Sequence, residues 1–577
     1  MGYPLRRTHA LGAVAAAALV SLSCSRCGAP SAGSAEELLP PGDGAVVTAP
    51  LGRLAEATVQ LSASAAQLPG GDQLGLAARA LVHQLGIDAL SREGLLAAGL
   101  DPDRGAALAL LPHPRGAQRP PWVAALPLTR PDLFTQRLDL LLQQRAGFPL
   151  RTEEARGGVK AVVFARPGLA ERLGYGLVRG YALLSRCADP AAELAAAAAR
   201  PEAQSLSRSP VLVQARQDLG RQDLMVLAPE ASELLQRFIR RPLPGASAAG
   251  LSVLAGGATL RLRVAQALGG GPLTALNTLL PGPLKPPLLP VPQDALVVRA
   301  QLAAGQLTAL LEALPLLAPA FLRLREELKA RAVDLDQDLF AALEPGAALS
   351  AGLAAHANLG RAVDPDLLDL RTHSPFDLLR VLAVARTGKA SRVRLALSAV
   401  AAALPALGAS VTPIAAGRFT GCQSDAWRVR YPGGEGLEFG LVSPGLEACQ
   451  AAVAGAAAPA PGAAAPAAAA LPAGETALVY ATGGGGNDGA ALLAAKARPS
   501  GATGDAAVVA EIDLGLLAAG VRALPDSAYG SGPQVFVARS LVSQVIDPLQ
   551  RLRGRLEVRP GARGVVVDLT LSLAAAK

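Results

Sequence analysis

The glycines around Gly484, followed by two acidic residues, have a spacing that could bind a dinucleotide. In TALVYATGGGGNDGAALLAAKA, residues Gly484, Gly486 and Gly489 satisfy the pattern G-x-G-x-x-G between an expected strand and an expected helix. Such glycines let a pyrophosphate approach a helix N-terminus, and Glu511 and Asp513 stand where an acid would hold the ribose. However, four consecutive Gly residues in a Gly-rich chain meet this spacing by chance, and no further βαβ units follow. We therefore expect a loop that joins a strand to a helix, without a cofactor.

The other residues that could do chemistry are scattered. No G-x-S-x-G, S-x-x-K, H-E-x-x-H or Walker A pattern occurs, so the recognisable nucleophile, zinc and phosphate arrangements are absent. His356 and His373 flank the stretch DPDLLD. Its carboxylates, Asp364, Asp366 and Asp369, follow no recognised metal-ligand spacing. We therefore predict a solvated acidic loop there, no metal site, and a chain that is not an enzyme.

The N-terminus has the layout of a secretory signal peptide. The stretch MGYPLRRTHALGAVAAAALVSLSC begins with Arg6 and Arg7 and continues with an apolar run over 10–20 that is too short to span a bilayer. Small residues then precede Cys24. The chain is therefore expected to leave the cytoplasm, and no second membrane span is predicted.

This stretch resembles a bacterial lipoprotein signal, except that Ser21 and Leu22 stand in the reverse of the usual order. The resemblance implies that residues 1–23 are removed and that Cys24 is acylated and becomes the new N-terminus. Ser25 follows the cysteine instead of Asp, which by the same resemblance favours the outer membrane. The alternative is a plain cleaved secretory signal. Either way the expected location is the cell envelope, with the lipid anchor on the periplasmic or outer side.

The later cysteines fit an exported protein. Cys422 and Cys449 are expected on a strand and on a nearby helix of the second half of the chain. In an oxidising compartment they would close a loop of roughly two dozen residues and add about 3 kcal/mol of stability. The alternative is a pair of buried free thiols. Cys187 is expected to be unpaired and to pack as a small apolar residue.

The composition argues against nucleic-acid binding. The chain of 577 residues carries a net charge of +8, but its Arg residues are scattered and aromatic residues make up only 3%. Nucleic-acid binders usually concentrate basic residues on one face and add aromatic side chains that stack on bases. With 51% hydrophobic residues the chain can bury a sizeable core, which excludes wholesale disorder.

Several segments of the first half recur in the same order in the second half. The stretch PGDGAVVTAPL over 41–51 corresponds to PQDALVVRAQL over 292–302, each a turn that leads into a short strand and then a helix. LDPDRGAALAL over 100–110 corresponds to LEPGAALSAGL over 343–353, an acidic-Pro turn that enters a strand. Each first strand is therefore expected to pair with the strand after its own acidic-Pro turn.

The segments that follow extend this correspondence. Apolar strands at 122–128 and 380–386 precede helices at 131–145 and 391–404, which are expected to cover the same face of their sheets. The stretch that begins TALVYATG corresponds in this alignment to the stretch that begins DLMVL in the first half.

Two pairs of hairpins complete the correspondence. Turns at Arg179-Gly180 and at 432–436 are expected at matching positions of the two sheets. Hairpins at 251–265 and 556–571 have second strands that alternate between apolar and polar residues. Alternation predicts one buried face and one wet face.

These patterns predict an α+β fold made of two tandem copies of a module, each with a mainly antiparallel sheet covered on one face by helices. The predicted parts are a signal peptide over 1–23, a tether over 24–36, copy A over 37–275, a Pro-rich linker over 276–292 and copy B over 293–577. In copy B, the Ala/Pro low-complexity stretch 451–472 is expected to be a loop. The segment 500–548 has no clear counterpart in copy A.

The openings LPPGDGAVVTAPL and LPVPQDALVVRAQL, behind a lipoprotein-like signal, resemble a family of uncharacterised bacterial exported proteins with tandem α+β modules. The resemblance implies a fold and a location, and it carries over no catalytic residue. Two functions are consistent with these features. The first is a non-enzymatic envelope lipoprotein that acts as a scaffold for protein partners. The second is a carrier or sensor that binds an apolar or lipid ligand between helices and sheet, which a cavity of about 300 Å³ or more would favour.

Overall fold

The computed structural model describes residues 33–573 with internal gaps, and its contacts divide the chain into two compact units. Unit 1 contains residues up to Ala267 together with Gly561–Leu573, and unit 2 contains the residues between Leu268 and Pro560. The gaps lie at 69–70, 89, 113–119, 146, 228–245, 255–258, 268–279, 281, 286–288, 290, 304–307, 309–317, 358–376, 415–422, 432–433, 444–476, 485–504, 530–533 and 562–563.

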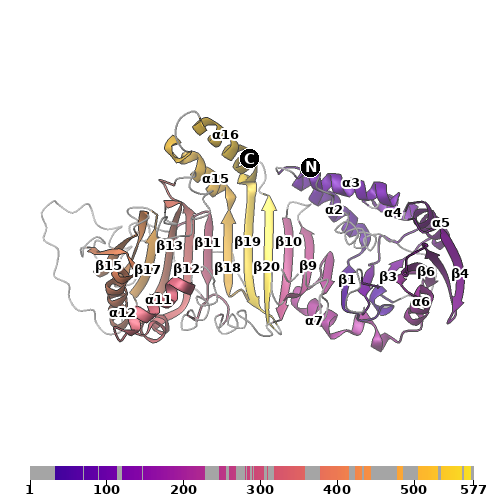
Figure 1. Cartoon of the computed structure of the whole chain (residues 1–577), viewed down its shortest axis with the longest axis horizontal. Helices are drawn as coiled ribbons and strands as arrows, with labels where there is room; N and C mark the ends of the chain where they lie inside the picture. The colour runs from indigo at the N-terminus through magenta and orange to yellow at the C-terminus, as the bar shows by residue number, and fades with distance from the viewer. Residues whose placement is uncertain are drawn as a thin grey trace. The chain divides into compact units, whose positions relative to one another are not determined.

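Unit 1 is built on an antiparallel sheet (Figure 1). Its strands are β1 Gly44–Thr48, β2 Ala107–Leu110, β3 Trp122–Pro127, β4 Leu150–Arg156, β5 Val159–Ala165, β6 Arg172–Val178, β7 Tyr181–Cys187, β8 Leu224–Leu227, β9 Ala246–Leu254, β10 Thr259–Ala267 and β20 Gly564–Leu573. The order across the sheet is β4-β5-β6-β7-β3-β2-β1-β8-β9-β10-β20, and each of these pairs is antiparallel. The last strand of the chain therefore completes unit 1.

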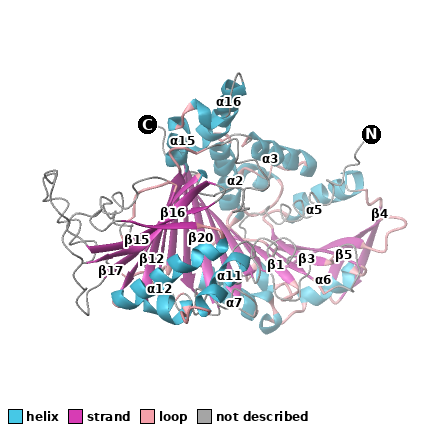
Figure 2. Cartoon of the chain, turned by 60° about the vertical axis from the view of Figure 1, so that its left-hand side comes forward, coloured by secondary structure: helices cyan, strands magenta, loops and turns pink. Residues whose placement is uncertain are grey.

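Helices cover both faces of this sheet (Figure 2). They are α2 Leu51–Ala65, α3 Asp72–Leu85, α4 Arg92–Ala97, α5 Pro131–Leu140, α6 Pro190–Ala198 and α7 Pro210–Leu219, with short turns at η1 Ala35–Glu37, η2 Leu141–Arg145, η3 Glu202–Gln204 and η4 Leu206–Arg208. Residues of α6 and α7 are buried with Val47 and Ala125 on one face, and residues of α2, α4 and α5 with Leu108 and Ala124 on the other. The prediction of helices on one face is therefore wrong for unit 1. Strands such as β3 are buried at nearly every position and need cover on both sides.

Local sequence signals explain where these elements begin and end. Arg179 and Gly180 have φ angles of 50° and 76°, the left-handed pair that a two-residue hairpin turn requires, and β6 pairs with β7 across it. Asp189 caps α6 by accepting a hydrogen bond from the backbone N–H of Ala192 at 3.1 Å, and Pro190 opens the helix. The predicted turn is confirmed.

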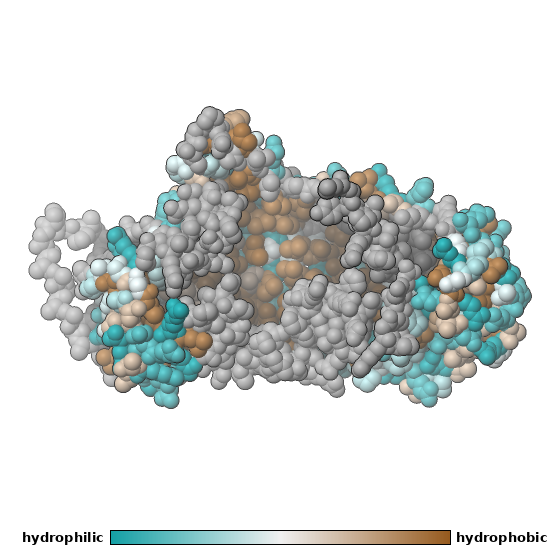
Figure 3. Space-filling model, viewed as in Figure 1, coloured by the Kyte–Doolittle hydropathy of each residue, from teal (hydrophilic) through white to brown (hydrophobic). Residues whose placement is uncertain are grey.

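The polar face of the alternating strand β10 is not exposed to solvent as predicted. Arg261 and Arg263 both bond Asp568 of β20, and Arg263 also donates to the backbone oxygen of Leu219 in α7 at 2.7 Å. The polar side is therefore packed against a helix, and Asp568 is only 2% exposed. Leu262 on the opposite side is half-buried, and Figure 3 shows mainly hydrophobic residues over β10 and β20. Expecting the polar side to be wet was wrong, because the arginines pair with a buried carboxylate.

The strands of unit 2 are also antiparallel (Figure 1). Its strands are β11 Leu296–Ala300, β12 Leu343–Leu353, β13 Leu379–Thr387, β14 Ser410–Ile414, β15 Gln423–Tyr431, β16 Gly434–Ser443, β17 Ala477–Gly483, β18 Val508–Asp513 and β19 Leu552–Pro560. Their order is β14-β15-β16-β17-β13-β12-β11-β18-β19. The helices are α11 Ala318–Lys329, α12 Ala390–Ala403, α15 Leu514–Ala523 and α16 Gln534–Ile546, with short turns at η8 Leu335–Leu339, η9 Phe340–Ala342, η12 Leu404–Leu407, η13 Asp526–Tyr529 and η14 Asp547–Arg551.

The helix α12 packs on the sheet of unit 2. Its Val393 and Leu397 are buried with Phe439 and Leu441 of β16. The stretch Ala390–Leu407, which α12 forms with η12, is long and apolar enough to cross a membrane by length and composition alone. Because one face of α12 is buried against strands, we describe it as an amphipathic helix of the fold.

The predicted pairings of the first strands are confirmed. Val46 of β1 faces Leu108 of β2, and Val298 of β11 faces Leu349 of β12. The prediction that the two hairpins take matching positions is wrong. In the hairpin at Arg179-Gly180, the second strand β7 pairs with β3. In the hairpin at 432–436, the second strand β16 pairs with β17, which separates it from β13. The two hairpins therefore do not occupy matching positions. The predicted loop over 451–472 lies outside the described residues.

Candidate functional site

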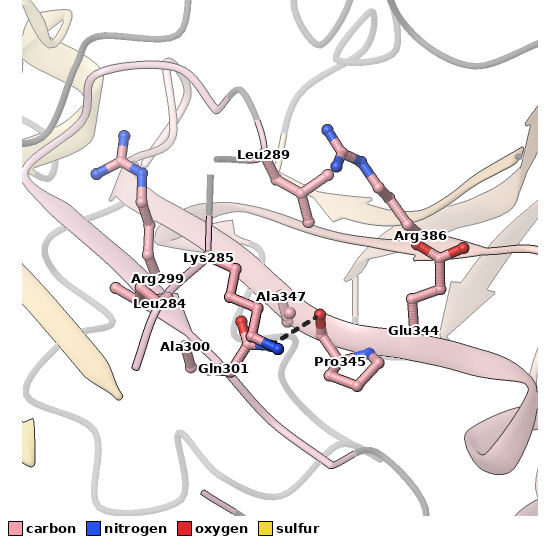
Figure 4. Close-up of a pocket in the computed structure, with 11 residues that line it drawn as sticks. Leu284, Lys285, Leu289, Arg299, Ala300, Gln301, Glu344, Pro345, Ala347 and Arg386 are labelled. Atoms are coloured by element: carbon pink, nitrogen blue, oxygen red, sulfur yellow. Dashed lines mark hydrogen bonds between the residues drawn. The ribbon is translucent and has the colours of Figure 1, made fainter. Parts of the chain in front are cut away.

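A cavity of about 330 Å³ lies in unit 2, where the chain before β11 crosses the ends of three strands (Figure 4). We call it the unit 2 cavity. Its lining comes from the approach to β11, from β11 and the residue after it, from the start of β12, and from β13. The lining residues are Leu284, Lys285, Leu289, Arg299, Ala300, Gln301, Glu344, Pro345, Gly346, Ala347 and Arg386.

An irregularity at the start of β12 shapes one wall of the cavity. The ladder between β12 and β13 is regular from Ala347 onward and shifts register between Leu343 and Ala347. Within this bulge Gly346 has a φ of 125°, a backbone conformation that other residues rarely adopt. The side-chain amide of Gln301 donates to the backbone oxygen of Pro345 at 3.4 Å. Bulges of this kind redirect side chains, and this one brings Glu344 to the cavity.

Cationic side chains dominate the charged part of the lining. Lys285, Arg299 and Arg386 carry positive charge, and Glu344 carries the negative charge. Arg299 on β11 and Arg386 on β13 project from the same face of the sheet, because Arg299 and Val384 both face Ala348 of β12. Figure 4 shows these two arginines rising to the same side of the ribbon, with Leu289 between them.

Arg299 is the most deeply buried of these cations and the least well paired. The residue is 6% exposed. Its nearest carboxylate oxygen, on Glu511, is 3.8 Å from its Nη1, beyond hydrogen-bonding distance, and its Nε has no hydrogen-bond partner among the described residues. Burial lowers the pKa of Arg299, and the nearby Glu511 carboxylate opposes this effect. A buried guanidinium with unused donors is costly unless something else bonds it.

A row of alternating charges runs from Arg299 across the neighbouring strands. Glu511 on β18 accepts a hydrogen bond from Arg555 of β19 at 3.0 Å, and Arg555 also donates to Glu557 at 2.7 Å. Glu511 is thus neutralised mainly by Arg555. The row holds the Glu511 carboxylate away from Arg299, which leaves the donors of Arg299 free.

The rest of the lining is apolar. Leu289 belongs to a buried cluster that also contains Val291, Val297, Ala348 and Val384. The cavity therefore combines cationic groups with a hydrophobic wall. This combination suits a small molecule that has an apolar part and a polar or charged part.

Within the described residues, the glycine pattern and the two acidic residues are not arranged as a dinucleotide site requires. Gly484 directly follows β17 with a φ of 84°, and a Cβ there would lie 2.2 Å from the backbone oxygen of Leu379. Close backbone packing thus explains this glycine. Glu511 and Asp513 lie on β18, which β13, β12 and β11 separate from β17. In a dinucleotide site the two strands are neighbours. Gly486 and Gly489 lie outside the described residues.

The other predicted site residues are distributed as follows. Cys24, Cys422 and Cys449 lie outside the described residues, so lipidation and the disulfide remain predictions. Cys187 is a free thiol at the end of β7, and burial raises its pKa. No group of three or more metal-binding side chains occurs within the part of the chain that the structure describes.

Sequence reasoning missed the unit 2 cavity. The available signal was Arg299 itself, because an Arg inside the apolar run LVVRA is unusual for a strand buried on both faces. Comparisons with protein-family models, with curated proteins and with solved structures found no match for this chain.

Proposed function

We propose that this chain is a non-enzymatic cell-envelope lipoprotein that acts as a carrier or sensor, with its ligand held in the unit 2 cavity. The observation that supports this proposal is the cavity of about 330 Å³, which exceeds the size that small-molecule sites require. Its wall of Leu284, Leu289 and Ala347 provides the apolar contacts. The ligand is therefore a small molecule with an apolar part.

The proposed anchor is the acylated Cys24, on the periplasmic or outer side of a membrane. The chain enters unit 1 soon after it: the backbone oxygen of Gly33 accepts a hydrogen bond from Tyr181 at 2.9 Å, and Glu36 pairs with Arg216 at 2.6 Å. The eight residues between Cys24 and Gly33 let these two residues lie at most about 30 Å apart. Unit 1 would therefore stay close to the membrane surface.

Metabolic labelling with a fatty-acid analogue tests the anchor. The wild type should be labelled and retained in the membrane fraction, whereas Cys24→Ala should lose the label, because the thiol is the acyl acceptor. Equal labelling of both proteins would contradict lipidation and favour a plain cleaved signal. A Cys27→Ala variant is the matched control and should be labelled like the wild type.

Filling the cavity tests ligand binding. Native mass spectrometry of the full chain, purified from its membrane, should detect a co-purifying small molecule in the wild type. Ala347→Phe should abolish it, because the added ring occupies the lined space. Ala351→Phe, four residues along the same strand and outside the lining, should retain it. Loss of the molecule from both variants, or from neither, would argue against this cavity as the site.

We also propose that the two units arose by tandem duplication of an α+β module. Support comes from the strand orders, β4-β5-β6-β7-β3-β2-β1-β8-β9 and β14-β15-β16-β17-β13-β12-β11-β18-β19, which agree at every place. In this correspondence Val46 matches Val298, since they face Leu108 and Leu349 respectively. The opening stretches, aligned by sequence, match Val46 with Val297 and are one residue out of register.

A scaffold for protein partners is the second candidate function. Phe536 and Val537 on α16 are 80% and 57% exposed, and two large apolar side chains in succession are unusual on a free surface. Crosslinking in intact cells from a photoreactive residue at position 536 would test this. A reproducible protein adduct, absent when the photoreactive residue stands at the exposed Arg539, would favour the scaffold.

A further inference from the structure

We infer that the ligand of the unit 2 cavity is an anion, with a carboxylate or phosphate head bound between Arg299 and Arg386. This inference rests on the proposed binding function and names the chemical class of its ligand. The charged lining has three cations and one anion, a net charge of +2 that comes from Lys285, Arg299, Arg386 and Glu344.

The burial of Arg299 is the first argument. Its side chain is 7% exposed, and the described residues give it no hydrogen bond. Arg555, on the same face of the sheet, is in contrast bonded to both Glu511 and Glu557. A guanidinium binds a carboxylate or phosphate through two parallel N–H donors, so an anion in the cavity would supply the missing acceptors.

The position of Arg386 is the second argument. It lies two strands away from Arg299 on the same face of the sheet, and the structure gives it no carboxylate partner among the described residues. Strand spacing places the two Cα atoms on the order of 12 Å apart, so the long side chains can approach one head group from both sides. Lys285 adds a third cation at the exposed side of the cavity.

The apolar wall distinguishes an amphipathic anion from a free inorganic one. Leu289 is 7% exposed and packs with Val291 and Val297 beside the arginines. An alkyl group attached to the anionic head would contact this wall. The head could belong to a lipid-derived acid or to a free phosphate, and a series of probes separates these sources.

The test is isothermal titration calorimetry of the full chain held in a non-ionic amphipol, with four probes that share a six-carbon tail. Hexanoate and hexyl phosphate should bind, hexanol should bind at least about tenfold more weakly, and hexylammonium should not bind, because only the anions complete the hydrogen bonds of Arg299. Inorganic phosphate should bind more weakly than hexyl phosphate, since it lacks the tail.

Variants identify the groups that bind the head. Arg386→Gln should weaken hexanoate binding at least about tenfold with an unchanged melting temperature, and Arg386→Lys should restore part of it. Arg299→Lys keeps the charge but loses the two-donor geometry, so it should weaken hexyl phosphate most. Arg380→Gln, a control in the same strand outside the cavity, should bind like the wild type.

The results distinguish failure of the anion assignment from failure of the proposed binding function. Equal binding of hexanol and hexanoate would overturn the anion assignment while supporting the proposed binding function. Inorganic phosphate that binds as tightly as hexyl phosphate would support the anion and overturn the apolar part of the proposal. If every probe binds Ala347→Phe as it binds the wild type, or none binds the wild type, both proposals are contradicted.

Discussion

Unit 1 has apolar side chains at the sheet positions where unit 2 has a row of charges. The fourth residue of β1 is Val47 and the fourth residue of β11 is Arg299, and each is 6% exposed. The fourth residue of β8 is Leu227, which is 1% exposed, whereas the fourth residue of β18 is Glu511. Equivalent positions of the two sheets therefore carry apolar side chains in unit 1 and charged side chains in unit 2.

The cavities differ in the same way. Unit 1 has a hollow of about 20 Å³, lined only by apolar residues such as Phe134 and Leu138, with room for about one water molecule. The unit 2 cavity is far larger and has cations in its wall. The same strand order thus supports either a closed core or a cavity lined by charged groups. The choice depends on a few side chains at the ends of β11, β12 and β13.

Exchanging the two buried residues should give the largest effect. Val47→Arg places an unpaired charge in the core of unit 1 and should destabilise it by about 4 kcal/mol or more. Arg299→Val should change the stability of unit 2 by less than about 1 kcal/mol, because Glu511 keeps its bond from Arg555 and the desolvated guanidinium is removed. Hydrogen exchange read by mass spectrometry would assign each loss to its unit. Similar losses of stability in the two variants would contradict the expected difference between these positions.

The strands could be predicted because their signals are local. Apolar runs bounded by Pro, Gly and Asp located β1, β2, β11 and β12, and turn chemistry located the hairpin at Arg179-Gly180. The pairings of the first strands followed from the repeated order of these signals, and they are confirmed.

Local signals could not show which strands of the two units correspond or in which register. The strand β17 was aligned with DLMVL, the sequence around β8, whereas β17 lies beside β13 as β7 lies beside β3. The long stretch between β16 and β17 stands where unit 1 has a two-residue turn, and this insertion displaced the alignment. The unit 2 cavity was missed for a related reason, because its lining comes from the approach to β11, from β11, from the start of β12 and from β13, and nothing local indicates that these segments meet.

Substituting a well-paired buried charge of unit 1 should lower stability far more than substituting Arg299. Asp568 is 2% exposed and accepts hydrogen bonds from Arg261 and Arg263. Asp568→Asn should therefore cost about 3 kcal/mol at pH 7, since it leaves two arginines partly buried without their partner. The control is Asp526→Asn at an exposed ion pair of unit 2, which should cost less than about 1 kcal/mol.

The loss of stability in Asp568→Asn should depend on pH. The two arginines lower the pKa of Asp568 below its ordinary value, against the effect of burial. The stabilisation is therefore complete above the unfolded pKa of about 3.9 and is lost as the pH falls through the folded value. Urea unfolding at pH 7 and at pH 3 should show the gap between wild type and variant narrowing in acid. A gap that is constant over this range would mean that the carboxylate charge is not what stabilises β20.

The smallest effect is expected at Asp101 in unit 1, a buried charge that, unlike Arg299, lines no described cavity. The residue is 0% exposed, its Oδ1 accepts from the backbone N–H of Asp103 at 3.0 Å, and its Oδ2 has no partner among the described residues. Burial raises the pKa of Asp101 to about 6. Because the folded pKa lies above the unfolded one, the folded state loses stability as the pH rises from about 4 to about 6.

Asp101→Asn should therefore stabilise unit 1 by about 2 kcal/mol at pH 8 and by almost nothing at pH 4, since the amide keeps the acceptor for Asp103 and removes the charge. Urea midpoints at the two pH values measure this, with Asp103→Asn, an exposed neighbour, as the control. Asp101→Asn should leave hexanoate binding unchanged, whereas Arg299→Val should abolish it with little change in stability. A variant that is less stable than the wild type at pH 8 would show that the Asp101 carboxylate has a partner that stabilises its charge.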